Sequence, residues 1–383
     1  MEWKEVRLGD VCTRVCSGGT PKSTNLSYYG GEIPWLNTKE IDFNRIYSTE
    51  KTITDSGLNN SSAKWIVPNT VTVAMYGATA GKSCIVKVPM TTNQACCNLT
   101  INDEVADYEF VYYTLKNDYT TLASLANGGA QQNLNAQIIK DYVLQMPSLA
   151  DQRRIASILS SLDRKIELNN KINADLEEMA QAIFKNWFVD FEPFKDGKFV
   201  DSELGMIPEG WKVGLLGELC NFKRGKNLLT KNAIDEGVPV VAGGLEPSCY
   251  HNIANTGAPV ITVSGSGANA GFMRMYHVPV WASDCSFIDI SCENFYFVYC
   301  FLKVNSKLLK HAQTGAVQPH VKPSDIHDFE LVIPDEESIY DFQDKVKPFF
   351  DRIASLQKEN SRLSSLRDTL LPRLMSGELE VPE

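Results

Sequence analysis

The chain has 383 residues, of which 43% are hydrophobic and 22% are charged, and its formal net charge is −10. This length exceeds one ordinary domain, and this composition excludes a disordered or collagen-like chain. No apolar run approaches the roughly 18 residues of a membrane span, and the first residues are too charged for a secretory signal. We therefore expect a cytoplasmic protein of two globular units with no membrane partner. The acidic balance argues against unaided binding of nucleic acid, because Lys and Arg neutralise phosphates.

The ten cysteines are scattered among apolar residues and do not form a disulfide framework. The nearest approaches to a metal-binding spacing are Cys12 with Cys16 and the neighbours Cys96 and Cys97. Because the sequence has no Cys-x-x-Cys motif and no cluster of His, the pattern favours reduced, buried thiols and predicts no metal site.

The sequence contains two copies of one unit. The opening segment from Trp3 to Cys12 recurs from Trp211 to Cys220, at a shift of 208 residues. Further along, Gly77-Ala-Thr-Ala-Gly81 matches Gly267-Ala-Asn-Ala-Gly271 at a shift of 190. The Phe-Val-Tyr at 110–112 matches 297–299 at a shift of 187. The matched segments keep the same order in both copies, as in a duplicated unit. Because the shift falls from 208 to 187 along the chain, the first copy contains additional residues in its early part.

Each copy is predicted to be of mixed α+β type. Apolar, β-branched runs at 70–75 and 259–263 are typical of buried strands. The segments 108–125 and 294–311 have the composition of short helices.

After each copy the apolar residues follow a 4,3 spacing, from Ile155 to Trp187 and, in the same register, from Phe342 to Leu374. This spacing predicts two helices, each on the order of 60 Å long, that pack as an antiparallel coiled coil and hold the globular units apart. A pseudo-two-fold would relate the two halves. Asn173 and Asn360 fall at equivalent seam positions, where a polar residue can fix the register.

Two glycine-rich segments resemble nucleotide-binding loops but fail on inspection. In Gly77-Ala-Thr-Ala-Gly81-Lys82-Ser83, three residues separate the glycines, whereas a phosphate-binding loop needs four. The segment Gly265-Ser-Gly267-Ala-Asn-Ala270 leads into residues without helical periodicity, although the dinucleotide fingerprint requires a helix there. A glycine turn between two strands is the better interpretation of both segments.

The sequence offers no grouping typical of a catalytic nucleophile, and four of its five histidines lie between His251 and His320 without counterparts in the first copy. Binding is therefore favoured over catalysis. Two alternatives remain: a coiled-coil scaffold with two protein-binding modules and, on the strength of the two glycine-rich segments alone, a nucleotide-dependent enzyme. The basic cluster from Lys223 to Lys231 counts against the scaffold.

With the repeat and the paired helices established, a set of short motifs resembles the specificity subunits of type I restriction-modification systems over nearly the whole chain. The motifs, in chain order, are Ser17-Gly-Gly-Thr-Pro21, Tyr28 to Leu36, Thr92-Asn-Gln-Ala95, Gly128 to Leu134, Gln152-Arg-Arg-Ile-Ala156, Ser202 to Trp211 and Leu370 to Leu379. Each motif is weak by itself, but the order is specific.

The resemblance implies two target-recognition domains that read a bipartite, asymmetric DNA site, with a gap set by the helices and by the ~34 Å repeat of DNA. It also implies two methyltransferase subunits on the helices and a possible restriction subunit. Methylation and cleavage, with S-adenosylmethionine, ATP and Mg²⁺, would reside in those partners, so this chain would not be an enzyme. The implied organisation is as follows: domain 1 at 1–150, central helix at 151–192, linker at 193–210, domain 2 at 211–334 and C-terminal helix at 335–383.

Side chains that read base edges are Arg, Lys, Asn and Gln, because their donors and acceptors match the major groove. Such side chains on or beside glycine- or proline-marked loops, together with one tyrosine and one histidine, are the candidate DNA-binding residues. In domain 1 they are Lys22, Asn37, Lys39, Tyr76, Lys82, Asn93, Gln94, Gln131, Gln132 and Asn133; in domain 2 they are Lys223, Arg224, Lys226, Asn269, Arg274, Gln318, His320 and Lys322. Gln131 and Gln318 occupy matched positions and could instead hold a loop that both domains share.

The second copy has Ser283-Asp284 where the first has Asn93-Gln94. Since a carboxylate can accept from cytosine N4 but repels phosphate, we expect the two domains to read different half-sites. Acidic residues outnumber basic ones in every segment, so much of the phosphate contact is expected from the methyltransferases.

Overall fold

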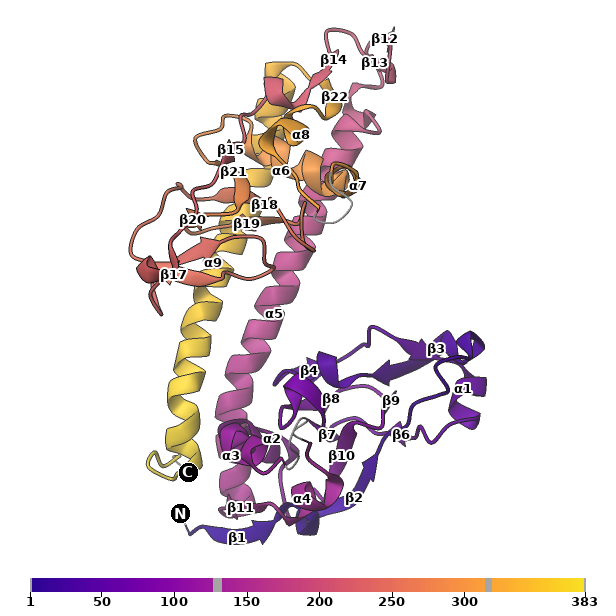
Figure 1. The fold of residues 1–383 in the computed structure, drawn as a ribbon, viewed down its shortest axis with the longest axis vertical. Helices are drawn as coiled ribbons and strands as arrows, with labels where there is room; N and C mark the ends of the chain where they lie inside the picture. The colour runs from indigo at the N-terminus through magenta and orange to yellow at the C-terminus, as the bar shows by residue number, and fades with distance from the viewer. Residues whose placement is uncertain (1, 127–132, 314–318, 382–383) are drawn as a thin grey trace. The chain divides into compact units, whose positions relative to one another are not determined.

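The computed structural model describes residues 2–126, 133–313 and 319–381. The chain divides into two compact units, residues 1–167 with 360–383 (unit 1) and residues 168–359 (unit 2). Both boundaries fall inside long helices, so each unit contains one globular part and half of each helix (Figure 1). In the described part of the chain, no helix has the length and apolarity needed to cross a membrane.

The two long helices are α5, Leu149–Phe188, and α9, Glu336–Met375. They occupy the segments in which the 4,3 spacing predicts helices, 151–192 and 335–383. Helix α5 ends before Phe191, which adopts a left-handed conformation, and α9 ends just before Gly377, whose φ of 74° suits a helix terminus. The C-terminal helix is thus shorter than its predicted segment, because this glycine turns the chain out of the helix.

Within unit 2 the two helices are antiparallel. Asn169 donates to Glu359 at 2.9 Å, and the rings of Phe184 and Phe342 lie 5.7 Å apart, so residue numbers rise along one helix as they fall along the other. In unit 1, Arg367 of α9 meets Asp163 of α5 at 2.7 Å. These pairs confirm the predicted antiparallel coiled coil.

Among the described residues, unit 1 contains a five-stranded sheet in the order β2-β10-β7-β8-β4. Its central strands are buried on both faces. Val71 and Val73 of β7 pack against α5 and against helix α2, Tyr108–Asn117, whereas Ala74 packs into a smaller cluster with Leu36 and Met90. The strands are β2 Cys12–Ser17, β4 Arg45–Ile46, β7 Val71–Ala74, β8 Ser83–Val86 and β10 Cys96–Ile101.

The rest of unit 1 surrounds this sheet. A four-stranded sheet has the order β5-β3-β9-β6, and β1 pairs with β11. These strands are β1 Lys4–Arg7, β3 Tyr29–Leu36, β5 Thr52–Ile53, β6 Trp65–Ile66, β9 Met90–Thr92 and β11 Val143–Met146. The short helices are η1 Leu8–Val11, η2 Leu26–Tyr28, η3 Thr38–Glu40, α1 Asp55–Asn59, η4 Gly77–Thr79, α2 Tyr108–Asn117, α3 Tyr119–Ser124 and α4 Ala136–Asp141.

Unit 2 repeats this design with a four-stranded main sheet in place of the five-stranded one. Its described residues form sheets in the orders β15-β21-β18-β19, β17-β16-β20 and β14-β22, and a hairpin β12-β13. The strands are β12 Phe199–Ser202, β13 Gly205–Pro208, β14 Lys212–Leu215, β15 Lys223–Arg224, β16 Val238–Val241, β17 Cys249–His251, β18 Val260–Ser264, β19 Met273–Tyr276, β20 Trp281–Ala282, β21 Cys285–Asp289 and β22 Glu330–Ile333. The helices are η5 Glu192–Phe194, η6 Leu216–Glu218, η7 Thr230–Asn232, α6 Phe295–Val304, α7 Ser306–His311 and α8 Pro323–His327.

The predicted buried strands are confirmed as β7 and β18, and each predicted short helix is present but broken in two, as α2 with α3 and α6 with α7. The segment interpreted as a linker, 193–210, contains the hairpin β12-β13. Gly205, with a φ of 96°, makes the turn, and its carbonyl accepts a hydrogen bond from Ser202 Oγ at 2.6 Å. Gly and Pro therefore mark a tight turn here instead of an extended connection.

Candidate DNA interface

Three loops of unit 1 meet at one end of the five-stranded sheet. The amide of Met75 donates to the carbonyl of Ala95 at 2.8 Å, and the amide of Leu134 donates to the carbonyl of Met75 at 2.9 Å. These bonds join the β7–β8 turn, the β9–β10 loop and the segment that precedes α4. We call residues 75–82, 93–95 and 133–135 loop cluster 1.

Unit 2 has the same arrangement. The amide of Gly265 donates to Asp284, and the amide of Val321 donates to Gly265, both at 3.1 Å. A β-bridge between Ser266 and His320 adds a further link. Residues 265–272, 283–285 and 319–322 form loop cluster 2, which lies at matched positions of the repeat.

Glycines shape both clusters. Gly77 and Gly267 have φ values of 78° and 79°, and Gly81 and Gly271 have φ values of 86° and 78°. These left-handed conformations favour glycine, so the two segments that resemble nucleotide-binding loops are turns between strands, as predicted. A Cβ on Gly18 would lie 2.2 Å from the carbonyl oxygen of Thr92, so this glycine permits close approach of the next loop.

Several predicted residues meet in these clusters with accessible side chains. Tyr76 is 39% exposed, Gln94 and His320 are exposed, and Asn133 is half-buried. Lys22, Lys223, Lys226 and Lys322 are also exposed. Gln131, Gln132 and Gln318 lie outside the described residues.

Other predicted residues use their polar atoms inside the protein. Asn93 is buried; it donates to Asn37 at 2.8 Å and accepts from the amide of Ala95 at 3.1 Å. Asn269 donates to the carbonyl of Gly243 at 3.4 Å. These contacts hold the loops in place. Of the neighbours Asn93 and Gln94, only Gln94 therefore exposes its side-chain amide.

Several predicted cations are paired with acids. Lys39 contacts Glu50 at 2.5 Å, Lys82 contacts Asp42 at 2.5 Å, and Arg274 contacts Glu246 at 3.0 Å. The hydrogen bond between Lys39 and Glu50 raises the pKa of Lys39 and lowers the pKa of Glu50, so both groups remain charged. Such exposed pairs contribute little stability and can open when phosphate approaches.

The carboxylate of Asp284 is shared by two neighbours, Arg224 and Ser266. The acid predicted to accept from cytosine is therefore oriented by an arginine that is itself a predicted DNA contact. Asp284 thus has less negative character than an isolated carboxylate, which reduces its repulsion of phosphate.

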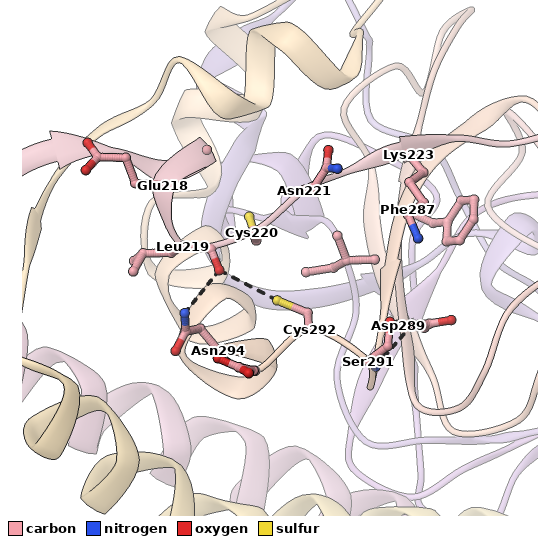
Figure 2. Close-up of a pocket in the computed structure, with 13 residues that line it drawn as sticks. Glu218, Leu219, Cys220, Asn221, Lys223, Phe287, Asp289, Ser291, Cys292 and Asn294 are labelled. Atoms are coloured by element: carbon pink, nitrogen blue, oxygen red, sulfur yellow. Dashed lines mark hydrogen bonds between the residues drawn. The ribbon is translucent and has the colours of Figure 1, made fainter.

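A polar cleft of about 470 Å³ lies beside β15 and β21 in unit 2, with Lys223 on its wall (Figure 2). Cys292 Sγ and Asn294 Nδ2 both donate to the carbonyl of Leu219. Burial raises the pKa of Cys220 and of Cys292, so both remain protonated thiols and lack the thiolate of a nucleophile. In the described part of the chain, no three His, Cys, Asp or Glu side chains group as a metal site.

The polar seam residues differ in their surroundings. Asn173 is half-buried, and its Oδ1 has no hydrogen-bond partner among the described residues. Asn360 is also half-buried. Asn169 is fully buried and donates to Glu359 across the helix pair. The 4,3 spacing alone does not show that Asn169, and not Asn173, makes such a contact. Whether Asn173 and Asn360 set the register stays a prediction.

The fold defines a protein made of two related α+β units, each with a glycine-shaped loop cluster, joined through two long helices. A family model described as the type I restriction modification DNA specificity domain matches residues 1–178 and 208–363. The chain belongs to this family of type I specificity subunits.

Similar proteins cover the whole chain. It is 31% identical, over 100% of its length and 94% of the relative, to the type I restriction enzyme MjaIX specificity subunit of Methanocaldococcus jannaschii. It is 26% identical, over 71% of its length and 77% of the relative, to the HindI specificity subunit of Haemophilus influenzae. The S subunit structure from M. genitalium has the same fold, with a TM-score of 0.59 at 20% identity over 98% of this chain and 96% of that one.

Proposed function

We propose that this chain selects the DNA target of a type I restriction-modification complex, with one half-site read by each unit. The observation that carries this proposal is the duplicated loop cluster. Both clusters are built on corresponding backbone hydrogen bonds, yet they present different side chains on corresponding loops: Tyr76, Gln94 and Asn133 in one, Ser266, Asp284 and His320 in the other.

This arrangement suits an asymmetric, bipartite target. A glutamine can bind adenine through paired hydrogen bonds, whereas an aspartate can accept from cytosine N4. Gln94 directly precedes Ala95, whose carbonyl accepts in unit 1 the bond that the carbonyl of Asp284 accepts in unit 2, so two similar frames read different bases. The two-helix connection provides an unread gap between the half-sites.

The catalytic steps belong to partner subunits in this proposal. Two methyltransferase subunits bind the helices and use S-adenosylmethionine, and a restriction subunit, where one joins, uses ATP and Mg²⁺. The exposed lysines beside the clusters supply part of the phosphate contact. The net charge of −10 opposes strong binding of DNA phosphates by this chain alone, so the methyltransferases supply the remaining phosphate contacts. The complex acts in the cytoplasm.

Methylome sequencing of a strain with and without this gene, in the presence of its methyltransferase, tests the proposal. We expect one methylated motif that disappears with the gene, with two unlike half-sites separated by unspecified bases. A contiguous motif, a perfect palindrome or an unchanged methylome would contradict the proposal.

A further inference from the structure

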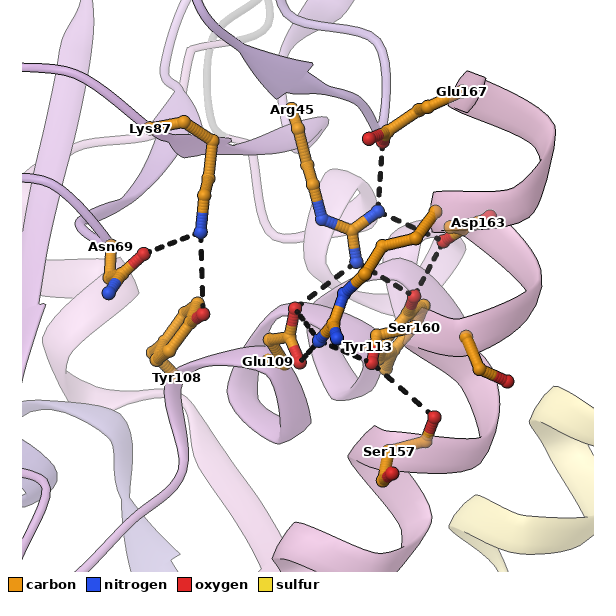
Figure 3. A network of polar contacts seen from close by, with 12 residues as sticks. Arg45, Asn69, Lys87, Tyr108, Glu109, Tyr113, Ser157, Ser160, Asp163 and Glu167 are labelled. Carbon is orange, nitrogen blue, oxygen red and sulfur yellow. Dashed lines mark hydrogen bonds and ion pairs between the residues drawn. The ribbon is translucent and has the colours of Figure 1, made fainter. Parts of the chain in front are cut away.

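Arg45 of β4 lies in a buried polar network within unit 1, far from loop cluster 1 in sequence (Figure 3). Its side chain is only 3% exposed. The guanidinium donates to Glu167 at 2.9 Å and to Glu109 at 3.3 Å, and it lies 3.9 Å from Asp163. A single side chain from the sheet thus reaches α2 and α5.

The network continues to α9. Tyr113 donates to Asp163 at 2.6 Å, because burial raises the pKa of the Tyr113 hydroxyl and keeps it protonated. Arg367 donates to the other oxygen of Asp163 at 2.7 Å, and Arg164 donates to Glu109 at 2.7 Å. The three arginines balance Glu109, Asp163 and Glu167, and Arg367 also pairs with Asp368 at 2.9 Å.

The segment that carries Arg45 also holds the glycine turn of loop cluster 1. Thr79 Oγ1 donates to the carbonyl of Thr38 at 3.0 Å, and Lys82 pairs with Asp42. Beyond the turn, the amide of Ile85 donates to Asn44 at 3.0 Å, and that of Lys87 donates to Ile46 at 2.9 Å. Residues 38–46 therefore touch the turn at one end and, through Arg45, the helices at the other.

Unit 2 lacks this connection in its described residues. Its strand β19 matches β8, but it ends its sheet with no counterpart of β4 beside it. At the shift of 187, Glu109 corresponds to Tyr296 and Asp163 to Phe350, and these two rings stack with centroids 5.0 Å apart. At these matched positions the contact is aromatic in unit 2 and ionic in unit 1. Unit 2 also joins α6 to α5 through Lys303 and Tyr299, which both bind Glu177, but neither of them comes from its sheet.

We propose that Arg45 is a positioning residue that fixes the orientation of loop cluster 1 on the helices. Unit 1 then binds its half-site well only when the gap between the half-sites has its native length. A planar guanidinium with several directed hydrogen bonds permits one orientation, whereas apolar contacts tolerate sliding. A buried ionic network is weak evidence for stability but can confer specificity of arrangement. This inference rests on the proposed function.

The test uses the full chain assembled with its methyltransferase subunits and DNA duplexes that carry the methylome-derived motif with its native gap or with one base pair added or removed. Three variants are compared with wild type: Arg45→Met, Arg45→Lys and the double variant Arg45→Met/Glu109→Gln. The double variant removes one charge of each sign and leaves the net charge of the network unchanged. Arg7→Met, which opens the exposed Arg7–Asp141 pair of the same unit, is the matched control.

We expect the preference for the native gap, as a ratio of methylation rates, to fall about tenfold in the Arg45 variants and to stay unchanged in Arg7→Met. The double variant should recover part of the melting temperature lost in Arg45→Met but should not recover the gap preference. If Arg45 only stabilised the fold, the two quantities would recover together. Gap preferences within about twofold of wild type would overturn the proposal, as would failure of all three variants to assemble. Failure of the proposed function is distinct, since the wild-type complex would then show no bipartite motif.

Discussion

The amide of Leu134 donates a hydrogen bond to the carbonyl of Met75 at 2.9 Å, and this bond joins the segment before α4 to the turn after β7. The matched bond in unit 2 runs from Val321 to Gly265 at 3.1 Å. Since the same connection holds both turns, the clusters differ in their side chains more than in their backbones. The base specificity of a cluster can therefore change through its side chains while the backbone of its loops stays the same.

Substitution of Gln94 or Asn133 by Ala should weaken recognition of the first half-site only. Loss of a base contact costs about 1–3 kcal/mol, which corresponds to roughly 5- to 150-fold in affinity. Binding of the methyltransferase complex to duplexes with each half-site mutated checks this outcome. Gln145→Ala, an exposed glutamine on β11, is the control; equal losses at both half-sites would contradict the prediction.

Asp284→Asn should change base preference in the second half-site. The substitution removes the carboxylate that Arg224 and Ser266 share and frees Arg224 for phosphate. We expect lower discrimination at one position together with tighter nonspecific binding and a steeper salt dependence. Titrations at several salt concentrations measure both effects, and an unchanged motif with unchanged salt dependence would exclude a role for Asp284.

Gly18→Ala should destabilise the folded chain, since the added Cβ would lie 2.2 Å from the carbonyl oxygen of Thr92. Backbone cannot yield as a flexible side chain does, so we expect a loss of about 2 kcal/mol in the free energy of unfolding. Urea denaturation measures it. Gly197→Ala, whose Cβ would lie 3.1 Å from its nearest atom, should cost clearly less; a reversed order would refute the steric argument.

Phe184→Ala should cost about 3–5 kcal/mol, because its buried ring contacts the rings of Phe188, Phe297 and Phe342. Met179→Ala on the same helix is the control, since Met179 is 49% exposed. Thermal and urea unfolding compare the two variants. Equal effects would show that the aromatic cluster does not anchor the helices of unit 2.

The stability of unit 2 should depend on pH through Asp335. Despite partial burial, which acts in the opposite direction, hydrogen bonds from Ser338 and Trp211 lower the pKa of Asp335 from its ordinary value of 3.8. The ionised carboxylate therefore stabilises the folded state above pH 3.8, and this contribution disappears as the pH falls through the lowered folded value. Melting temperatures of wild type and Asp335→Asn should differ at pH 6, and the difference should shrink as the pH falls below 3.8. A constant difference would contradict this assignment.

Local patterns were sufficient for much of the fold. The 4,3 spacing predicted both long helices and their shared register, and the apolar runs predicted β7 and β18, because period and composition are properties of neighbouring residues. The hairpin in 193–210 was missed, since Gly and Pro mark tight turns and extended connections alike.

The candidate site was predicted less completely. Residue type pointed equally to Asn93 and Gln94, but only the fold shows that Asn93 faces Asn37 whereas Gln94 is exposed. Arg45 gave no sequence signal because its partners lie on α2 and α5, far along the chain.

The sequence by itself determined the repeat, the helix pair and the family, because each is written in the order and spacing of residues along the chain. Only the tertiary structure decided which polar side chains are accessible and which hold loops or bind sheet to helix. The physical reason is that burial and hydrogen bonding depend on neighbours brought together by strand register and helix packing, and these neighbours are distant in sequence.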